Sequence, residues 1–325
     1  MKALLRLTRA HTVPLEAVPA AVGALLATGG EVTWGVGFWL LFGVGYHLVG
    51  YAHNSWADWK NGHDKDDPHK QHHPLNTGEL DGPWVGFFVG VSSLALMFYA
   101  FYGTVVFGNP WVVSLLILGA VFAWMYNEKG KETRMKTLYI SIAHSTVFMI
   151  PYFALGGEVT LAFIFSLLTV MFWVVYQILI SGEIKDFETD DVNFILDHSV
   201  ISSDGTKRPS ESVVLLGAIL RAVIGVFALL TSMFYGGGDD VLLIIIGITV
   251  VSAFLSREMV ANEYNKRDDA VETMALIEIT SLFTFLMATS PVYGRLLAGV
   301  LLTCSVIWVL TMNRIMWNTS IKPDV

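Results

Sequence analysis

Long apolar runs alternate along the chain with short turns and with longer charged segments. A helix that spans a bilayer needs about 20 mostly apolar residues, and ten runs reach or approach that length. They are residues 13–28, 34–53, 83–107, 110–126, 137–155, 159–181, 212–235, 241–256, 273–290 and 294–313. Prolines and a glutamate interrupt the first run, and the eighth run is short. The pattern predicts an all-α, polytopic transmembrane helical bundle of nine or ten spans.

The composition agrees with a membrane protein. Hydrophobic residues make up 54% of the 325 positions, charged residues only 15%, and the mean hydropathy is +0.57. Soluble domains average about 45–50% apolar and about 25% charged residues, so a soluble fold is excluded. The net charge of −8 gives no sign of a nucleic-acid partner, and we expect none. The single cysteine, Cys304, excludes an intramolecular disulfide. No clear cleavage site follows the basic N-terminus, so we expect a retained first span.

The loops differ in charge in a way that predicts orientation. Junctions after odd-numbered spans are short and rich in glycine, whereas loops after even-numbered spans are long and charged. Eighteen of the 20 Lys and Arg residues lie at the two termini or in the long loops; the exceptions are Arg295 and Arg221. The positive-inside rule then places both termini and the long loops in the cytoplasm, where they would cap the bundle.

Two of the long loops begin with acidic stretches. The first acidic stretch is residues 51–78, after span two, and the second acidic stretch is residues 181–191, after span six. Each carries a pair of oxygen-bearing side chains four residues apart: Asn54 with Asp58, and Asp186 with Asp190. Residues at i and i+4 share one helix face, so each pair can direct its oxygens to one point. Both stretches follow even-numbered spans and should lie on the same membrane face.

Such a concentration of oxygen ligands predicts a divalent cation. Several carboxylates in a partly dry site repel one another unless a cation offsets the charge. Asp and Asn oxygens suit Mg²⁺, which shares its coordination sphere with substrate phosphates. Calcium remains open, although no loop has the EF-hand pattern. A solvated loop is the alternative for either stretch taken alone. We expect the two stretches to face each other across a central cavity and to hold Mg²⁺ and a diphosphate.

Three motifs resemble those of one known family. Residues 54–64 follow the spacing Asn-x3-Asp-x3-Gly-x-Asp, residues 73–78 read His-Pro-Leu-Asn-Thr-Gly, and residues 186–190 read Asp-x3-Asp. These resemble the signatures of the UbiA superfamily of intramembrane prenyltransferases, and their positions after spans two and six also fit. The resemblance covers most of the chain and implies one domain over residues 1–325.

The family's chemistry implies a role for each acidic position. The resemblance implies an enzyme that transfers a polyprenyl group, in the class of transferases of alkyl groups other than methyl. Mg²⁺ would bind the donor diphosphate, the allylic carbon–oxygen bond would ionise, and a lipophilic acceptor would capture the cation. The implied metal ligands are Asn54, Asp58, Asp64, Asp186 and Asp190. Of these, Asp58, Asp186 and Asp190 would be catalytic.

Basic residues near both stretches are expected to bind the diphosphate. Arg9 resembles an arginine of the family's first helix, and Tyr126 with Lys129 or Lys131 resembles a Tyr/Lys diphosphate contact. Lys185 directly precedes the second motif, as is common in the family. The alternative for these residues is that they only follow the positive-inside rule.

The chain departs from the family pattern in ways that leave the acceptor open. His73 stands where arginine is usual, Ser55 stands where Asp is frequent, and a polar segment, residues 192–210, replaces the usual continuation after Asp191. The spacing to Gly62 favours the quinone-forming branch and a dihydroxynaphthoate-like acceptor, but the loop with Tyr126 does not. Other aromatic acceptors and isoprenoid lipids remain open.

Several polar or aromatic residues within the spans are candidates for an acceptor or cation pocket: His47, Trp56, His144, Gln177 and Arg221. Charged residues inside a membrane usually face the bundle interior and mark functional sites. The alternatives are an interfacial aromatic belt for Trp56 and a structural or snorkelling role for Arg221.

Two other functions remain open at this stage. A terpene cyclase on the same scaffold would capture the carbocation internally, and a cation-coupled transporter would use the carboxylates as ion sites. The clustering of carboxylates at one membrane face favours an enzyme. We expect membrane lipid around the bundle and see no feature that requires a protein partner.

Overall fold

The computed structural model describes residues 1–64, 70–185, 192–201, 207–261 and 267–319. Within these residues, ten helical stretches are long and apolar enough to cross a membrane. They are Ala10–Ala27, Trp34–Asn61, Gly82–Val106, Val112–Glu132, Lys136–Ala154, Leu161–Lys185, Glu211–Phe234, Asp239–Ala261, Ala270–Tyr293 and Arg295–Trp317. The predicted all-α polytopic bundle is therefore confirmed. The central cavity and the single domain stay predictions.

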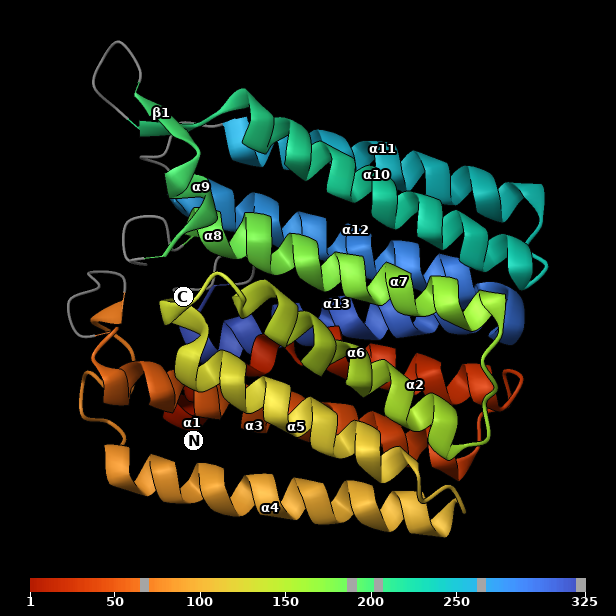
Figure 1. Cartoon of the computed structure of the whole chain (residues 1–325), viewed down its shortest axis with the longest axis horizontal. Helices are drawn as coiled ribbons and strands as arrows, with labels where there is room; N and C mark the ends of the chain where they lie inside the picture. The colour runs from red at the N-terminus through yellow and green to blue at the C-terminus, as the bar shows by residue number, and fades with distance from the viewer. Residues whose placement is uncertain (65–69, 186–191, 202–206, 262–266, 320–325) are drawn as a thin grey trace. The chain divides into compact units, whose positions relative to one another are not determined.

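The chain divides into two compact units, of which the first contains Met1–Gly130, Ile142–Glu158 and Thr303–Val325. Its elements are α1 (Lys2–Leu7), η1 (Ala10–Thr12), α2 (Pro14–Ala27), α3 (Trp34–Asn61), α4 (Gly82–Val106), α5 (Val112–Lys129) and parts of α6 (Lys136–Ala154) and α13 (Arg295–Trp317). Helix α3 contacts α1, α2, α4 and α5, and the long, nearly parallel course of α3, α4 and α5 is visible in Figure 1. The first acidic stretch begins at the end of this central helix.

The second unit contains Lys131–Ser141 and Val159–Leu302. Its elements are the end of η3 (Gly130–Glu132), α7 (Leu161–Tyr176), the π-helix η4 (Gln177–Gly182), α8 (Glu183–Lys185), α9 (Phe194–Asp197), β1 (Ser199–Ile201), β2 (Lys207–Pro209), α10 (Glu211–Phe234), α11 (Asp239–Ala261), α12 (Arg267–Tyr293) and the first parts of α6 and α13. Helix α10 packs against α7, α11 and α12, and these helices run side by side in Figure 1.

The polar segment that departs from the family pattern has structure of its own. It contains α9 and the antiparallel pair β1–β2, in which Val200 pairs with Arg208. The side chain of Asn193 accepts a hydrogen bond from the amide of Leu196 and caps α9. The segment is therefore partly folded over its described residues.

The helix bounds differ from the predicted runs where polar residues extend a helix. Helix α3 continues from the predicted end at residue 53 to Asn61, so Asn54 and Asp58 lie on it. The short eighth run becomes the full helix α11, which includes Arg257 and Glu258. A hydropathy window ends at the first charges, whereas backbone hydrogen bonds continue a helix beyond the apolar stretch.

Helices α2 and α3 approach each other closely at Gly43. A Cβ atom at this position would lie 2.8 Å from the Cα of Ala17 and 2.9 Å from the Cβ of Ala20. Small residues let transmembrane helices pack with their backbones close together. This contact brings Glu16 of α2 and His47 of α3 within reach of each other.

Candidate functional site

The first acidic stretch is held by the C-terminal turn of α3. Gly62 has φ +83°, and the amide of His63 donates to the carbonyl of Asp58 at 2.9 Å while the amide of Gly62 donates to the carbonyl of Trp59 at 3.1 Å. This pair of bonds is a Schellman motif, which favours glycine at the left-handed position. The motif reverses the chain directly after the helix. Asp58 lies on the last turn of α3, and Asp64 comes two residues after Gly62.

Asp64 is held in place by two residues from further along the loop. Its carboxylate lies 3.3 Å from the ammonium group of Lys70, and both side chains are buried. The side-chain amide of Asn76 donates to the carbonyl of Asp64 at 3.1 Å and to the carbonyl of Lys70 at 2.8 Å. Asn76 therefore joins Asp64 and Lys70, which lie on either side of residues 65–69.

His73 lies in the same cationic environment. Burial lowers the pKa of His73 to about 3, and the positive charges of Lys70, Arg9 and His72 add to this effect while Asp64 opposes it. Its Nδ1 atom is buried and has no hydrogen-bond partner within the described part of the chain. At neutral pH this imidazole is therefore uncharged, unlike the arginine that is usual in the family motif.

Arg9 has an unusual backbone conformation beside α3. Its φ of 45° and ψ of 47° are left-handed, which costs an L residue about 1–2 kcal/mol. Its guanidinium carbon lies 5.1 Å from the ring centroid of Tyr51, one turn from Asn54 on α3. Strained residues cluster at functional sites, and this one presents a cation close to the predicted metal ligands.

The predicted diphosphate contacts after span four lie around the end of α5. Tyr126 is half-buried and Lys129 is exposed, both in the first unit, whereas the half-buried Lys131 belongs to the second unit. Between them, the side-chain amide of Asn127 lies 3.4 Å from the carbonyl of Gly50 of α3. Glu128 also contacts α3, through His53 at 3.2 Å and Lys60 at 3.4 Å.

The second acidic stretch falls partly outside the described residues, because both Asp186 and Asp190 belong to residues 186–191. Its flanks are well defined. The buried carboxylate of Glu183 contacts Lys136 at 2.9 Å and accepts from the amide of Phe194 at 2.9 Å, and the side chain of Asn193 donates to the carbonyl of Glu183 at 2.8 Å. These bonds join the two ends of the segment, and the half-buried Lys185 is the last residue before it.

The complete metal site is not visible in the described residues. Among them, no three His, Cys, Asp or Glu side chains gather closely enough to hold a metal ion. Two of the five predicted ligands, Asp186 and Asp190, lie outside. The predicted meeting of the two acidic stretches therefore stays a prediction.

The remaining candidate pocket residues have different surroundings. Trp56 donates to the carbonyl of Gly82 at 3.1 Å and packs against α4. In the second unit, Gln177 begins the π-helix η4, a rare element that is frequent at functional sites. Arg221 is buried, donates to the hydroxyl of Ser281 at 2.8 Å and stacks on Tyr176 at 4.9 Å.

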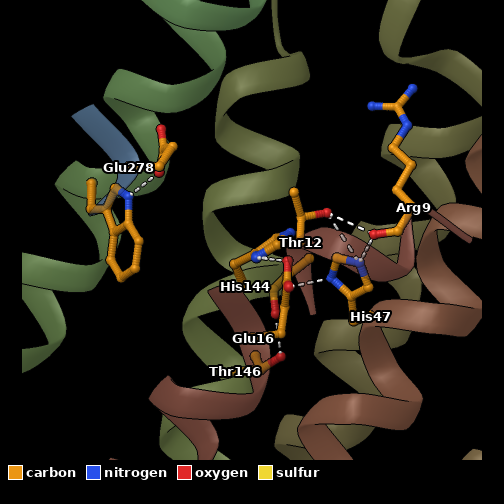
Figure 2. A network of polar contacts seen from close by, with 9 residues as sticks. Arg9, Thr12, Glu16, His47, His144, Thr146 and Glu278 are labelled. Atoms are coloured by element: carbon orange, nitrogen blue, oxygen red, sulfur yellow. Dashed lines mark hydrogen bonds and ion pairs between the residues drawn. The ribbon is translucent and has the colours of Figure 1, made fainter. Parts of the chain in front are cut away.

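His47 and His144 meet on a buried carboxylate in the first unit. Glu16 of α2 binds Nδ1 of His47 with one oxygen and lies 3.2 Å from Nδ1 of His144 with the other. Figure 2 shows both rings pointing toward this carboxylate. The two candidate pocket residues are thus brought together by a third residue.

Sequence reasoning missed three residues of this site. In the sequence, Glu16 only interrupts an apolar run, Lys70 is one of the charges of a long loop, and Asn76 is part of the motif at residues 73–78. An available signal for Glu16 was its place inside a predicted span, where an ionisable residue is costly. Nothing local to Lys70 or Asn76 predicts their contacts, which depend on the path of the loop.

Comparison with protein families identifies one match. The model of the UbiA prenyltransferase family matches residues 17–282. A comparison with curated proteins finds no match. Together with the ten apolar helices, the family match identifies an integral membrane protein.

Solved structures with a similar fold include homologues of UbiA. A UbiA homologue from Aeropyrum pernix K1 has a TM-score of 0.62 at 17% identity, over 91% of this chain and 96% of that one. A UbiA homologue from Archaeoglobus fulgidus bound to GPP and Mg²⁺ has a TM-score of 0.63 at 16% identity, over 89% of this chain and 99% of that one. A digeranylgeranylglyceryl phosphate synthase has a TM-score of 0.63 at 13% identity, over 90% of this chain and 98% of that one. At these identities the likeness concerns the fold.

Proposed function

Because the chain belongs to the UbiA prenyltransferase family, we propose that it transfers a polyprenyl group from a polyprenyl diphosphate to a lipophilic acceptor, with Mg²⁺ as its cofactor. The similar Archaeoglobus fulgidus structures bound to GPP or DMAPP with Mg²⁺ support the donor class and the metal. The reaction belongs to the transfer of alkyl groups other than methyl.

The observation that carries the proposal is the turn that joins Asp58 to Asp64. Asn54 and Asp58 lie one turn apart on α3, and the Schellman motif at Gly62 returns the chain so that a second buried carboxylate follows at once. A carboxamide and two carboxylates form a set of hard oxygen donors, which fits Mg²⁺. Asn54, Asp58 and Asp64 would hold the metal from the first unit, and Asp186 and Asp190 would complete its ligands.

The chain's own residues have separate tasks in this scheme. When bound, Mg²⁺ supplies positive charge that stabilises the departing diphosphate. Arg9 and Lys70 add fixed cations near the same helix end, and the stacking of Arg9 on Tyr51 orients its guanidinium group. Tyr126, Lys129, Lys131 and Lys185 are further proposed diphosphate contacts. The positions of Lys and Arg support a cytoplasmic location for this site and for both termini.

For the acceptor, we propose a quinone precursor such as dihydroxynaphthoate. The Asn-x3-Asp-x3-Gly-x-Asp spacing supports this choice. Other aromatic compounds and isoprenoid lipids belong to the same proposal as the wider acceptor class. The proposed pocket includes His47, Trp56, His144, Gln177 and Arg221.

The test is product analysis with purified protein in detergent or lipid nanodiscs. Protein, Mg²⁺ and geranylgeranyl diphosphate are incubated with dihydroxynaphthoate, 4-hydroxybenzoate or an isoprenoid glycerol phosphate, and products are identified by mass spectrometry. We expect one acceptor to gain a prenyl group with release of diphosphate, and no product when EDTA removes Mg²⁺.

Two outcomes would replace the proposal. A hydrocarbon or prenyl alcohol formed equally without acceptor would identify a terpene cyclase. Absence of any diphosphate release, together with Mg²⁺-dependent ion flux in vesicles, would identify a transporter.

A further inference from the structure

Glu16, His47 and His144 form a buried polar group inside the membrane-spanning region. The three residues come from α2, α3 and α6, and all three belong to the first unit. The side chain of Glu16 is 2% exposed and that of His47 is 0% exposed, whereas that of His144 is 15% exposed. Figure 2 shows the carboxylate between the two imidazole rings. His144 is therefore the most exposed member of the group.

The hydrogen bonds of His47 show which of its ring nitrogens carry a hydrogen. Its Nε2 lies 3.1 Å from the carbonyl oxygen of Arg9 and 3.3 Å from the hydroxyl of Thr12. The carbonyl only accepts, and the hydroxyl of Thr12 already donates to that carbonyl at 2.9 Å. Nε2 of His47 must therefore carry a hydrogen, and its Nδ1 shares a second hydrogen with the carboxylate of Glu16.

The same reasoning gives the tautomer of His144. Its Nδ1 lies 3.2 Å from the second oxygen of Glu16. An ionised carboxylate only accepts, so Nδ1 of His144 carries the hydrogen and Nε2 keeps its lone pair. A carboxylate that holds one ring nitrogen and leaves the other basic is the arrangement that orients the histidine of hydrolytic triads. His144 is thus prepared to accept a proton at Nε2.

Charge compensation alone does not explain the second histidine. A lone carboxylate inside a membrane is costly, and one buried histidine partner offsets that cost. His47 meets this need, because it is fully buried and both of its ring nitrogens are bonded. His144 adds a second, partly exposed imidazole on the same carboxylate.

The group lies on the side of α3 that carries the predicted metal ligands. His47, Tyr51, Asn54 and Asp58 follow at spacings of four, three and four residues, which places them on one helix face. Seven residues separate His47 from Asn54, about 10 Å along the helix axis. An acceptor that lies deeper in the membrane than the diphosphate would therefore be on the same side of α3 as this group.

We propose that His144 is the base that removes the acceptor's proton during prenyl transfer, and that Glu16 positions it. This inference rests on the proposed function and assigns the acceptor as a phenol or hydroquinone. The allylic carbon–oxygen bond breaks and diphosphate leaves with the electron pair. A carbon or oxygen atom of the acceptor bonds to the allylic carbon, and the proton from that atom passes to Nε2 of His144. The imidazolium formed is stabilised by Glu16 and later gives the proton to water.

The experiment compares four proteins with geranylgeranyl diphosphate, Mg²⁺ and the hydroquinone dihydroxynaphthoate: wild type, His144→Ala, Glu16→Gln and the control Ser145→Ala. Ser145 is the next residue of α6, is buried, and its hydroxyl has no partner within the described residues. General-base catalysis contributes about 10²–10⁴-fold to a rate. We expect His144→Ala to lose at least about 100-fold in kcat, Glu16→Gln to lose less, and Ser145→Ala to match wild type.

Two further measurements separate catalysis from folding. The Kd for geranylgeranyl S-thiolodiphosphate, a donor analogue that resists ionisation, should be the same in His144→Ala and wild type. Added imidazole should restore part of the activity of His144→Ala and leave that of Glu16→Gln unchanged. A structural role for His144 would give no rescue.

The outcomes distinguish this inference from the function on which it rests. A wild type that prenylates neither dihydroxynaphthoate nor 4-hydroxybenzoate overturns the acceptor class and with it the role of His144; if it also fails with every other acceptor, the proposed function fails too. Normal kcat in His144→Ala, or a loss that imidazole does not restore, overturns the role of His144 and leaves prenyl transfer intact.

Discussion

At Gly62 the conformation of a single residue determines where a predicted metal ligand lies. Its φ of +83° forms the turn between Asp58 and Asp64, and among the described residues nothing beyond its chain neighbours lies within 4 Å of where a Cβ would be. The effect of a substitution at this position therefore comes from backbone strain and not from crowding.

For Gly62→Ala we expect the free energy of unfolding to fall by about 1–2 kcal/mol, the cost of a left-handed L residue. We also expect turnover to depend less strongly on Mg²⁺, because Asp64 would shift. Thermal unfolding in detergent and a Mg²⁺ titration of turnover measure both effects. The control is Gly37→Ala in the same helix, where φ is ordinary and no atom crowds the Cβ; it should be neutral or slightly stabilising. Equal behaviour of the two variants would contradict this account.

His73 gives a prediction about pH. Its pKa is about 3 in the folded protein and about 6.5 when unfolded. The unfolded chain therefore binds the proton more readily than the folded protein. The contribution of His73 to the free energy of unfolding is full above pH 6.5 and falls as the pH drops toward 3, by at most about 1.4 kcal/mol per pH unit. In His73→Asn the melting temperature should fall less between pH 7 and pH 5 than in wild type. Identical pH dependence in the two proteins would show that His73 does not contribute.

At this scale the sequence predicts residue types better than contacts. Asn54, Asp58 and Asp64 were identifiable because their spacing is local and repeats a family motif. Glu16 was not, because its partners His47 and His144 come from helices that are 31 and 128 residues away along the chain. Such pairs depend on helix packing, which no local pattern encodes.

The pairing of α2 with α3 is the element-scale contact that positions the buried carboxylate. Gly43 allows the close approach, and His47 follows one turn later. For Gly43→Ala we expect the free energy of unfolding to fall by about 1–3 kcal/mol because of overpacking. We also expect reduced turnover, because Glu16 and His47 would separate. Gly50→Ala, in the same helix with open space around its Cβ, is the matched control. Thermal unfolding of the two variants measures the difference. Equal melting temperatures for Gly43→Ala and Gly50→Ala would contradict the packing argument.

Hydrophobic runs predicted the helices well and their ends poorly. All ten spans were found because about 20 apolar residues is a strong pattern. The apolar runs predicted neither the end of α3 at Asn61 nor the π-helix at Gln177. Both depend on hydrogen bonds of polar residues at the membrane boundary, which hydropathy does not measure.

Orientation in the membrane is a property of the whole molecule. In a Cys304→Ser background, we expect Glu31→Cys, between α2 and α3, to react with a membrane-impermeant maleimide in intact cells. Arg134→Cys, between α5 and α6, should react only after permeabilisation, because the long charged loops are predicted to be cytoplasmic. Both positions are exposed. The reverse labelling pattern would invert the topology.

The central claim is that both acidic stretches hold one diphosphate through Mg²⁺. The most direct test is the binding of geranylgeranyl S-thiolodiphosphate, measured calorimetrically with and without Mg²⁺ in wild type, Asp58→Asn and Asp186→Asn. The account predicts Mg²⁺-dependent binding in wild type and at least about tenfold weaker binding, or about 1.4 kcal/mol, in each folded variant. Undiminished Mg²⁺-dependent binding in either variant would contradict it.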